Sequence, residues 1–221
     1  MTSSIEADFD RLALLDDQGW TANNHYHGFL LKHVPHNCEN ALEIGCGTGA
    51  FARQLAQRCK RVIGLDLSPE MIRAARSRSK QFDNFEFQLA DVSTWNFPQS
   101  HFDFICSIAT LHHVPQQREL LVKIRDALRP RGVLVVLDLV QSSNLVERMF
   151  DVIGLGVSSG LRLIHNGRLQ PPPEVRKAWE QHGQHDSYAT VREMRALATE
   201  ILPGASVKRH LLWRYTLVYR K

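Results

Sequence analysis

The fold is decided by one stretch, Ala41-Leu42-Glu43-Ile44-Gly45-Cys46-Gly47-Thr48-Gly49-Ala50. A short apolar run contains an acid, three glycines follow at alternate positions, and residues 51–57 then read as a helix. This pattern predicts a strand, a tight turn and the N-terminus of a helix. Glycines permit the φ values of such a turn and let a ligand approach the backbone, and a helix N-terminus favours anionic ligand groups. The stretch therefore predicts a site for a nucleotide-like molecule.

The glycines alone leave the identity of that molecule open. The spacing Gly45-x-Gly47-x-x-Ala50 satisfies the dinucleotide fingerprint in its alanine variant, and Asp66 follows about 20 residues later, where a ribose-binding acid is expected. Nicotinamide and flavin cofactors are therefore possible on this pattern. Glu43, two positions before the first glycine, separates the possibilities. Its carboxylate suits a pyrophosphate poorly but is compatible with a cofactor that carries an ammonium and a sulfonium.

With Glu43 ahead of the glycines, the stretch resembles the first motif of the class I S-adenosylmethionine-dependent methyltransferases, acid-x-Gly-x-Gly-x-Gly. The resemblance continues in order. Predicted strands at 61–66 and 85–91 end in Asp66 and Asp91, a third spans 102–107, and a helix at 120–128 leads through 129–132 into a strand at 133–137. Five elements match the family in order and spacing, over residues 40–138.

The resemblance implies an α/β fold with a Rossmann-like, doubly wound sheet of seven strands in the order 3-2-1-4-5-7-6, the last strand antiparallel. At 221 residues the chain is most simply one domain. We divide it into an N-terminal helical lid (1–39), a cofactor-binding core (40–138), a substrate-covering helical insertion after strand five (139–190), and a C-terminal helix with two strands (191–221). The insertion reads as a helix, a glycine-rich bend, three prolines and a second helix.

Ligands of open parallel sheets lie beyond the carboxyl ends of the strands, here between strands one and four. By resemblance, Asp66 accepts hydrogen bonds from both ribose hydroxyls, and Asp91 accepts from the adenine amine. The cofactor-binding prediction comprises Glu43, Gly45, Gly47, Gly49, Asp66, Leu67, Met71, Asp91, Val92 and Ser107. The alternatives are that the acids only cap the following turns and that Met71 is ordinary core.

Two histidines, His112 and His113, follow the fourth predicted strand and are the catalytic candidates. Methyl transfer from a sulfonium is a direct displacement, so alignment and exclusion of water supply much of the catalysis. A hydroxyl or protonated amine acceptor also benefits from a general base, which is most often histidine. The alternative is that one imidazole packs against a helix and the other is solvated.

The acceptor is predicted to be a small molecule, methylated at oxygen or nitrogen. Residues 107–110 read Ser-Ile-Ala-Thr, unlike the Asp/Asn-Pro-Pro-aromatic motif of enzymes that methylate base amines or glutamine amides. The acceptor site is expected between the N-terminal helices and the insertion, with Tyr26, His165 and Tyr188 as candidate wall residues. Alternatives are an RNA or protein methyltransferase that uses the bare core, and a non-catalytic binding protein.

Composition adds limits to these predictions. The net charge is +4, but the basic residues are scattered, so the charge does not favour a nucleic-acid partner. No apolar stretch reaches membrane-spanning length, and the four cysteines show no paired spacing, which favours a reduced, cytoplasmic protein. The motif His182-x-x-His185-Asp186 offers a possible metal pair but no third ligand nearby, so no metal is predicted. The oligomeric state is not indicated.

Overall fold

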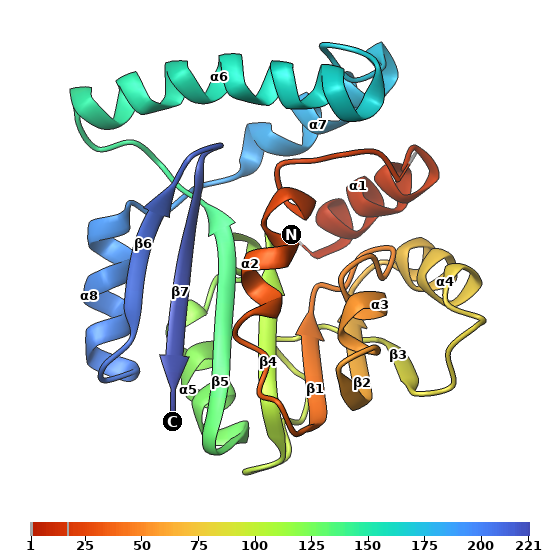
Figure 1. Cartoon of the computed structure of the whole chain (residues 1–221), viewed down its shortest axis with the longest axis vertical. Helices are drawn as coiled ribbons and strands as arrows, with labels where there is room; N and C mark the ends of the chain where they lie inside the picture. The colour runs from red at the N-terminus through yellow and green to blue at the C-terminus, as the bar shows by residue number, and fades with distance from the viewer. Residues whose placement is uncertain (1, 17) are drawn as a thin grey trace.

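The computed structural model describes residues 2–16 and 18–221, without the side chains of residues 2–4 and 185. Its centre is one seven-stranded sheet in the order β3-β2-β1-β4-β5-β7-β6 (Figure 1), which confirms the predicted topology. Among the described strands, β7 alone runs opposite to the other six, and it pairs antiparallel with both β5 and β6. The strands are β1 (Cys38–Ile44), β2 (Cys59–Asp66), β3 (Phe85–Leu89), β4 (Phe102–Ile108), β5 (Leu128–Leu139), β6 (Ser206–His210) and β7 (Arg214–Arg220).

The helices fall into those that cover the sheet faces and those that lie over its carboxyl edge. The α-helices are α1 (Thr2–Leu14), α2 (His27–Leu31), α3 (Ala52–Leu55), α4 (Pro69–Arg78), α5 (Gln117–Ala127), α6 (Leu145–Asn166), α7 (Pro173–His182) and α8 (Val191–Ile201). Short 3₁₀ turns are η1 (Asn24–Tyr26), η2 (Leu111–His113) and η3 (Gly183–His185).

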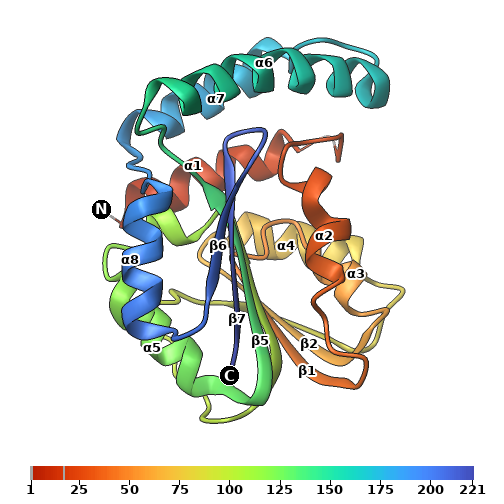
Figure 2. The same ribbon diagram turned by 60° about the vertical axis from the view of Figure 1, so that its left-hand side comes forward.

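Alternating strand residues build a core on each face of the sheet. Leu42 and Ile44 of β1 pack with α5 and α8 on one side, whereas Ala41 packs with α2, α3 and α4 on the other. Figure 2, which views the sheet nearly edge-on, shows α5 and α8 across the sheet from α2 and α3. Both faces are buried, as parallel sheets require, so a ligand can enter only at an edge.

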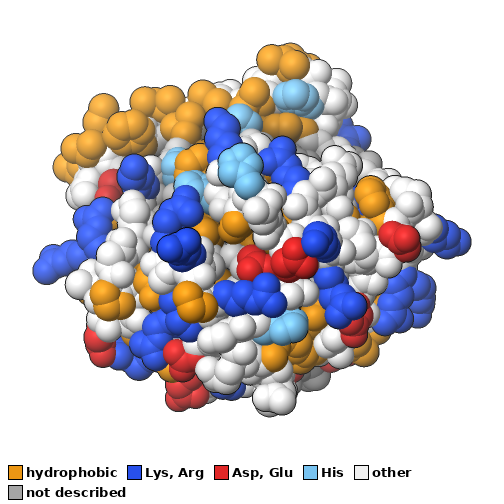
Figure 3. All heavy atoms as spheres, turned by 60° about the horizontal axis from the view of Figure 1, so that its bottom comes forward, with side chains coloured by type: hydrophobic (Ala, Val, Ile, Leu, Met, Phe, Trp, Pro, Cys, Tyr) orange, Lys and Arg blue, Asp and Glu red, His pale blue; other side chains and the backbone are white. Residues whose placement is uncertain are grey.

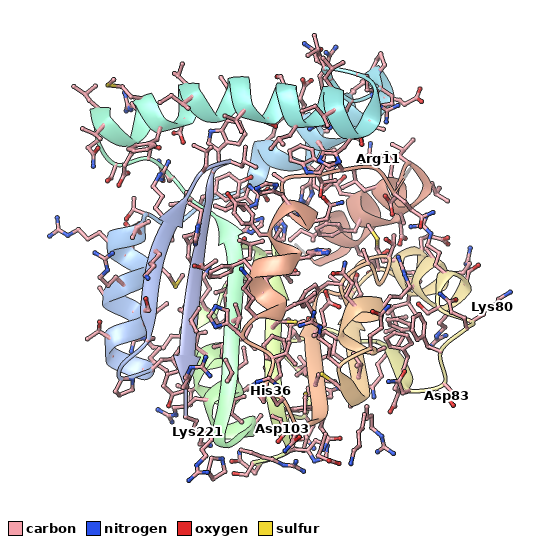
Figure 4. All side chains as sticks on the ribbon, in the orientation of Figure 1. Arg11, His36, Lys80, Asp83, Asp103 and Lys221 are labelled. Atoms are coloured by element: carbon pink, nitrogen blue, oxygen red, sulfur yellow. The ribbon has the colours of Figure 1, made fainter. Side chains whose placement is uncertain are left out.

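The carboxyl edge of the parallel strands lies under α1, α6 and α7, at the top of Figure 1. Figure 4 shows the opposite, amino edge at the bottom, marked by Asp103 and Lys221. There the Asp103 carboxylate accepts hydrogen bonds from the backbone N–H groups of Glu39 and Asn40, both at 2.9 Å. The two edges therefore differ: hydrogen bonds to Asp103 hold the amino edge together, and the carboxyl edge carries the helices that lie over a site.

Several predicted elements differ in extent from the structure. The expected helix at 51–57 is a single turn, α3, and the helical lid expected at 1–39 is divided into α1, η1 and α2. The glycine-rich bend expected in the insertion is confined to Gly167, which ends α6 with a φ of 68°. Three other glycines lie inside α6, because its long apolar pattern outweighs the cost of about 1 kcal/mol that each glycine imposes on a helix.

Candidate functional site

A cavity of about 1070 Å³ lies at the carboxyl edge of the sheet. Its floor is formed by the ends of β1, β2 and β4 and the turns that follow them. One wall comes from α1 and the segment after it, and the cover comes from α6, α7 and the chain that follows α7. Three segments that are far apart in sequence therefore enclose one space, at the switch point where ligands of such sheets bind.

The glycine turn after β1 contributes backbone to this floor. Gly45 and Gly47 line the cavity and have φ values of 71° and 50°, in the left-handed region that glycine tolerates best. A Cβ on Gly45 would lie 2.0 Å from Oγ1 of Thr110, so the absence of a side chain lets the β4 loop close over the turn. A Cβ on Gly47 would meet nothing nearer than Sδ of Met71 at 3.9 Å, so its backbone faces open space.

Glu43 is a buried acid at the bottom of the cavity, with a residue exposure of 2%. Its Oε2 has no hydrogen-bond partner among residues 2–16 and 18–221. Burial, followed by the nearby Asp66 carboxylate, raises the pKa of Glu43 well above its usual value. An unpartnered carboxyl oxygen facing a cavity is a site for a cation or a strong donor.

Asp66 ends β2 and is held by two backbone donors. Gly47 N–H donates to its Oδ2 at 2.8 Å, and Ser68 N–H donates to its Oδ1 at 3.0 Å. Burial raises the pKa of Asp66, while those N–H donors oppose the shift. Each carboxylate oxygen keeps a further lone pair, and Asp66 lines the cavity, so it can accept two more hydrogen bonds from a ligand.

The remaining predicted cofactor residues divide into two groups. Leu67, Met71, Asp91 and Val92 line the cavity, with Met71 also packed against α1 through Leu12 and Ala13. Ser68 caps α4 by accepting from Met71 N–H at 3.0 Å, which fixes that helix beneath α1. By contrast, Gly49 and Ser107 are not among the residues that line the cavity. The residues after Ser107, namely Ile108, Ala109 and Thr110, form that part of the wall.

His112 and Asp138 form a buried pair between the ends of β4 and β5. Nδ1 of His112 lies 2.6 Å from Oδ1 of Asp138, and the His112 backbone N–H donates to Oδ2 at 2.9 Å. A carboxylate only accepts, so Nδ1 is the donor in this contact. The pair thus orients the imidazole in the cavity wall, with Nε2 on the opposite side of the ring, 3.8 Å from Oδ2 of Asp186.

His113 lies beside this pair, in a cluster with residues after α7. Burial, and then the neighbouring His112, lower the pKa of His113 to about 4, so its imidazole is neutral at pH 7. Its Nδ1 is 3.4 Å from Oδ1 of Asp186, and Tyr188 donates to Oδ2 of Asp186 at 2.9 Å. Phe9 of α1 packs edge-on against His113, which ties the N-terminal helix to the cluster.

The same cluster is the arrangement nearest to a metal site among the described side chains. His112, His113 and Asp186 each offer one ligand atom, and these atoms lie within 4.8 Å of one another. His182 also approaches Asp186, with Nε2 at 3.8 Å from Oδ2. The side chain of His185, the other half of the possible metal pair, lies outside the described residues. Three such ligands can hold a divalent cation.

Sequence reasoning placed some acceptor-side residues in the cavity and misplaced others. Tyr188 lines it, whereas Tyr26 and His165 do not. Tyr26 instead donates its hydroxyl to the Leu211 carbonyl at 2.5 Å, and His165 stacks on Trp20. Tyr26 therefore joins η1 to the turn between β6 and β7, and does not face the cavity.

Two polar residues at the site were not predicted: Asp138, which pairs with His112, and Arg214, which lines the cavity. Asp138 could have been found, because it follows an apolar strand as Asp66 and Asp91 do. Arg214 is buried, with its Nε donating to Asn23 at 2.9 Å, and burial lowers its pKa. No sequence signal connects Arg214 to a segment 191 residues away, because that contact depends on how η1 packs on the sheet.

Comparisons with known proteins agree with this geometry. A family model described as a methyltransferase domain matches residues 42–136. An uncharacterized methyltransferase of Mycobacterium tuberculosis is 29% identical over 211 residues, 92% of this chain and 98% of that protein. The demethylmenaquinone methyltransferase of Tropheryma whipplei is 37% identical over 98 residues, 44% of this chain and 41% of that enzyme.

A solved structure shares the whole fold. The complex of DhpI with SAH (S-adenosylhomocysteine) superposes with a TM-score of 0.67 at 19% identity, over 99% of this chain and 96% of that chain. Residues 42–136 therefore form a methyltransferase domain, and the findings together support a class I S-adenosylmethionine-dependent methyltransferase. The family explains the acid before the glycines, the strand-end acids and the strand order within one architecture.

S-adenosylmethionine is accordingly the cofactor, and the cavity floor fits it. The unpartnered, buried Oε2 of Glu43 suits a cationic ligand group rather than a pyrophosphate. Asp66 has free acceptor capacity for hydroxyl donors, and Leu67 and Met71 offer apolar surface to a flat ring. In the family, SAM supplies an electrophilic methyl group on its sulfonium.

Proposed function

We propose that this methyltransferase acts on a small-molecule acceptor, at oxygen or nitrogen, inside the cavity. The observation that carries the proposal is the cover over the site: α1, α6 and α7 lie over the carboxyl edge, and the cavity of about 1070 Å³ lies beneath them. Sites for small molecules typically measure about 300–1,000 Å³. A macromolecular acceptor needs an open face, which these helices obstruct.

We further propose that Glu43, Gly45, Gly47, Asp66, Leu67, Met71, Asp91 and Val92 bind the cofactor. Support comes from their common position along the floor of the cavity. Gly49 and Ser107 act indirectly in this proposal: Gly49 shapes the turn with a φ of 75°, and Ser107 precedes the wall residues 108–110. The strand-end acids provide acceptors, and the glycine turn leaves room for the ligand against the backbone.

The proposed catalytic group is His112. Its Nδ1 is engaged by Asp138, so Nε2 is the nitrogen that can take the proton of the acceptor as the methyl group is transferred. The carbon–sulfur bond breaks as the new bond to oxygen or nitrogen forms, and the proton moves to Nε2. His113 is assigned a positioning role, because its imidazole is buried against Phe9 and held beside Asp186.

The proposed acceptor wall is formed by α1 and the insertion. Phe9, Trp20, Val175 and Trp179 supply apolar surface, and Tyr188 and Arg214 supply polar groups close to the His112 pair. The demethylmenaquinone methyltransferase relative is named for a small molecule, which supports the same acceptor class.

All four cysteines are buried free thiols, which favours a reducing compartment such as the cytoplasm.

The test is conversion of SAM to SAH by purified protein with a fractionated metabolite extract, with total RNA or with a protein extract. The proposal expects turnover only with metabolite fractions, and loss of that turnover in His112→Ala. Turnover with RNA or protein alone would contradict it. Binding of SAH without turnover under any condition would support the non-catalytic alternative.

A further inference from the structure

The α6 helix presents an apolar surface to solvent. Ten of its large hydrophobic side chains are exposed, from 37% for Val157 to 77% for Ile164. They are Leu145, Val146, Met149, Phe150, Val152, Ile153, Leu155, Val157, Leu163 and Ile164. Figure 3 shows hydrophobic side chains gathered along the top of the molecule, where α6 lies in Figure 1. No helix of the described chain is long and apolar enough to cross a membrane.

The polar side of α6 faces the protein. Asp151 of α6 accepts a hydrogen bond from Arg209 of β6 at 2.7 Å, and a Cβ on Gly154 would lie 3.6 Å from Cζ2 of Trp213. A surface helix normally buries its apolar side and exposes its polar side. In α6 the arrangement is reversed, so the exposed apolar side lacks the cover that such a surface normally has.

The spacing on this exposed side indicates what covers it. Val146, Phe150, Ile153, Val157, Gly160 and Ile164 follow one another at intervals of four, three, four, three and four residues. We call these six residues the α6 seam. An average interval of 3.5 residues is the pattern of a helix that packs along a second helix. An interfacial helix on a lipid surface would instead carry an excess of Lys and Arg on its polar face, whereas α6 carries two acids, Glu147 and Asp151, against two arginines, Arg148 and Arg162.

We propose that two copies of this chain associate through the α6 seam, with the two helices antiparallel about a two-fold axis near residue 155. In that register Val146 meets the partner's Ile164, and Ile153 meets the partner's Val157. Phe150, 52% exposed, meets the partner's Gly160, where a Cβ would have nothing within 4 Å. The two-fold axis repeats this contact, so Phe150 of each copy packs over Gly160 of the other, as an isologous interface requires.

The size of the patch agrees with a specific but modest interface. The ten exposed side chains, about three-fifths exposed on average, amount to an apolar α6 surface of roughly 400–700 Å² per chain, or roughly 800–1,400 Å² from two copies. The largest patch on a typical monomer is about 300–600 Å², and specific interfaces bury about 1,200–2,000 Å² from both chains together. We expect a dimer whose population rises with protein concentration. This inference does not depend on the acceptor proposed above.

The test is sedimentation velocity over a range of micromolar concentrations, with Ile153→Glu as the disrupting variant. The wild type is expected to form dimers, and the variant to weaken the dimer at least about a hundredfold, because two charges would be desolvated in one interface. The matched control is Leu89→Glu, since Leu89 is 56% exposed and Ile153 55%. Leu89 lies on β3, outside the seam, so this control should dimerise normally.

The register is tested separately by a compensating pair. Gly160→Leu should weaken the dimer by crowding the partner's Phe150, and Phe150→Ala combined with Gly160→Leu should restore it. Circular dichroism checks that each variant keeps its helices. A monomeric wild type, equal dissociation of both glutamate variants, or a failure of the double variant to recover would overturn the proposal. Binding of monomeric protein to anionic vesicles would identify a lipid surface as the occupant and would also overturn it.

Discussion

The floor and the cover of the cavity are held in different ways. The floor acids Glu43 and Asp66 lie at the carboxyl ends of the adjacent strands β1 and β2, and Asp91 follows the end of β3 by two residues, so the sheet fixes their relative positions. The cover, formed by α6 and α7, lies above the sheet and exposes much of its apolar surface. The family match spans 42–136 and stops before this cover. We therefore propose that the scaffold binds the cofactor and that the helices above it select the acceptor.

The largest expected effect is at the boundary between floor and cover, where His112 pairs with Asp138. We expect His112→Ala to lower kcat by about 10²–10⁴-fold, the usual contribution of a general base, with unchanged affinity for SAH. Turnover and calorimetry measure the two quantities separately. His36→Ala, exposed at the opposite edge in Figure 4, is the matched control. A variant with full kcat would remove His112 from the mechanism.

Within the floor, Asp66→Ala should weaken SAH binding by about 2 kcal/mol, or about thirtyfold, because two hydrogen bonds to a charged acceptor would be lost. Calorimetry with folded variants measures this. Asp83→Asn replaces an exposed carboxylate away from the cavity and serves as the control. Unchanged affinity in Asp66→Ala would mean that this carboxylate only supports the turn at Gly47.

Within the cover, Trp179→Ala should raise the KM for the acceptor about tenfold and leave SAH affinity unchanged. Trp179 lines the cavity but is half-exposed, so the change removes roughly 1–2 kcal/mol of apolar contact without emptying a core. Steady-state kinetics with the acceptor identified from the extract provides the measurement. If SAH affinity fell instead, the division between floor and cover would be incorrect.

A smaller effect concerns the pH dependence of stability. The pKa of Glu43 is raised in the folded state by burial and then by Asp66. For an acid whose folded pKa is raised, stability is fully present below the unfolded pKa and is lost as pH rises through the folded pKa. Glu43→Gln should remove this loss, so the unfolding free energy of the variant relative to the wild type should increase as pH rises. Thermal unfolding at several pH values measures it, and a pH-independent difference would contradict it.

The smallest expected effect is that of metal removal. His112, His113 and Asp186 lie close enough to hold a cation, but the proposed transfer needs only the base and an aligned acceptor. Dialysis against a chelator should leave kcat and KM unchanged. Loss of activity that returns on adding a divalent cation would assign the cluster to metal binding.

Much of the cavity floor was predictable from sequence, because a single rule predicts where its acidic residues lie. Apolar strands that end in acids bring those acids to one edge of a parallel sheet, and this rule predicted Glu43, Asp66 and Asp91. The strand order followed from the resemblance and was confirmed. Applied to the strand at 133–137, the same rule would also have found Asp138.

The cover was less predictable, because it depends on tertiary packing. Tyr26 was expected to face the cavity, but its hydroxyl binds the Leu211 carbonyl. The contact between Phe9 and His113 joins α1 to η2, and no local pattern encodes such a pairing. The long α6 helix was expected to bend at its glycines, yet its apolar seam continues through them.

The most direct test of this division is a crystal structure with SAH bound. The account predicts that the sulfur lies inside the cavity, enclosed by α1, α6 and α7, with Nε2 of His112 facing the space next to it. The ribose should lie against Asp66 and the adenine between Leu67 and Met71. A sulfur that opens onto a shallow, exposed surface lined by Arg and Lys would contradict the account and indicate a macromolecular acceptor.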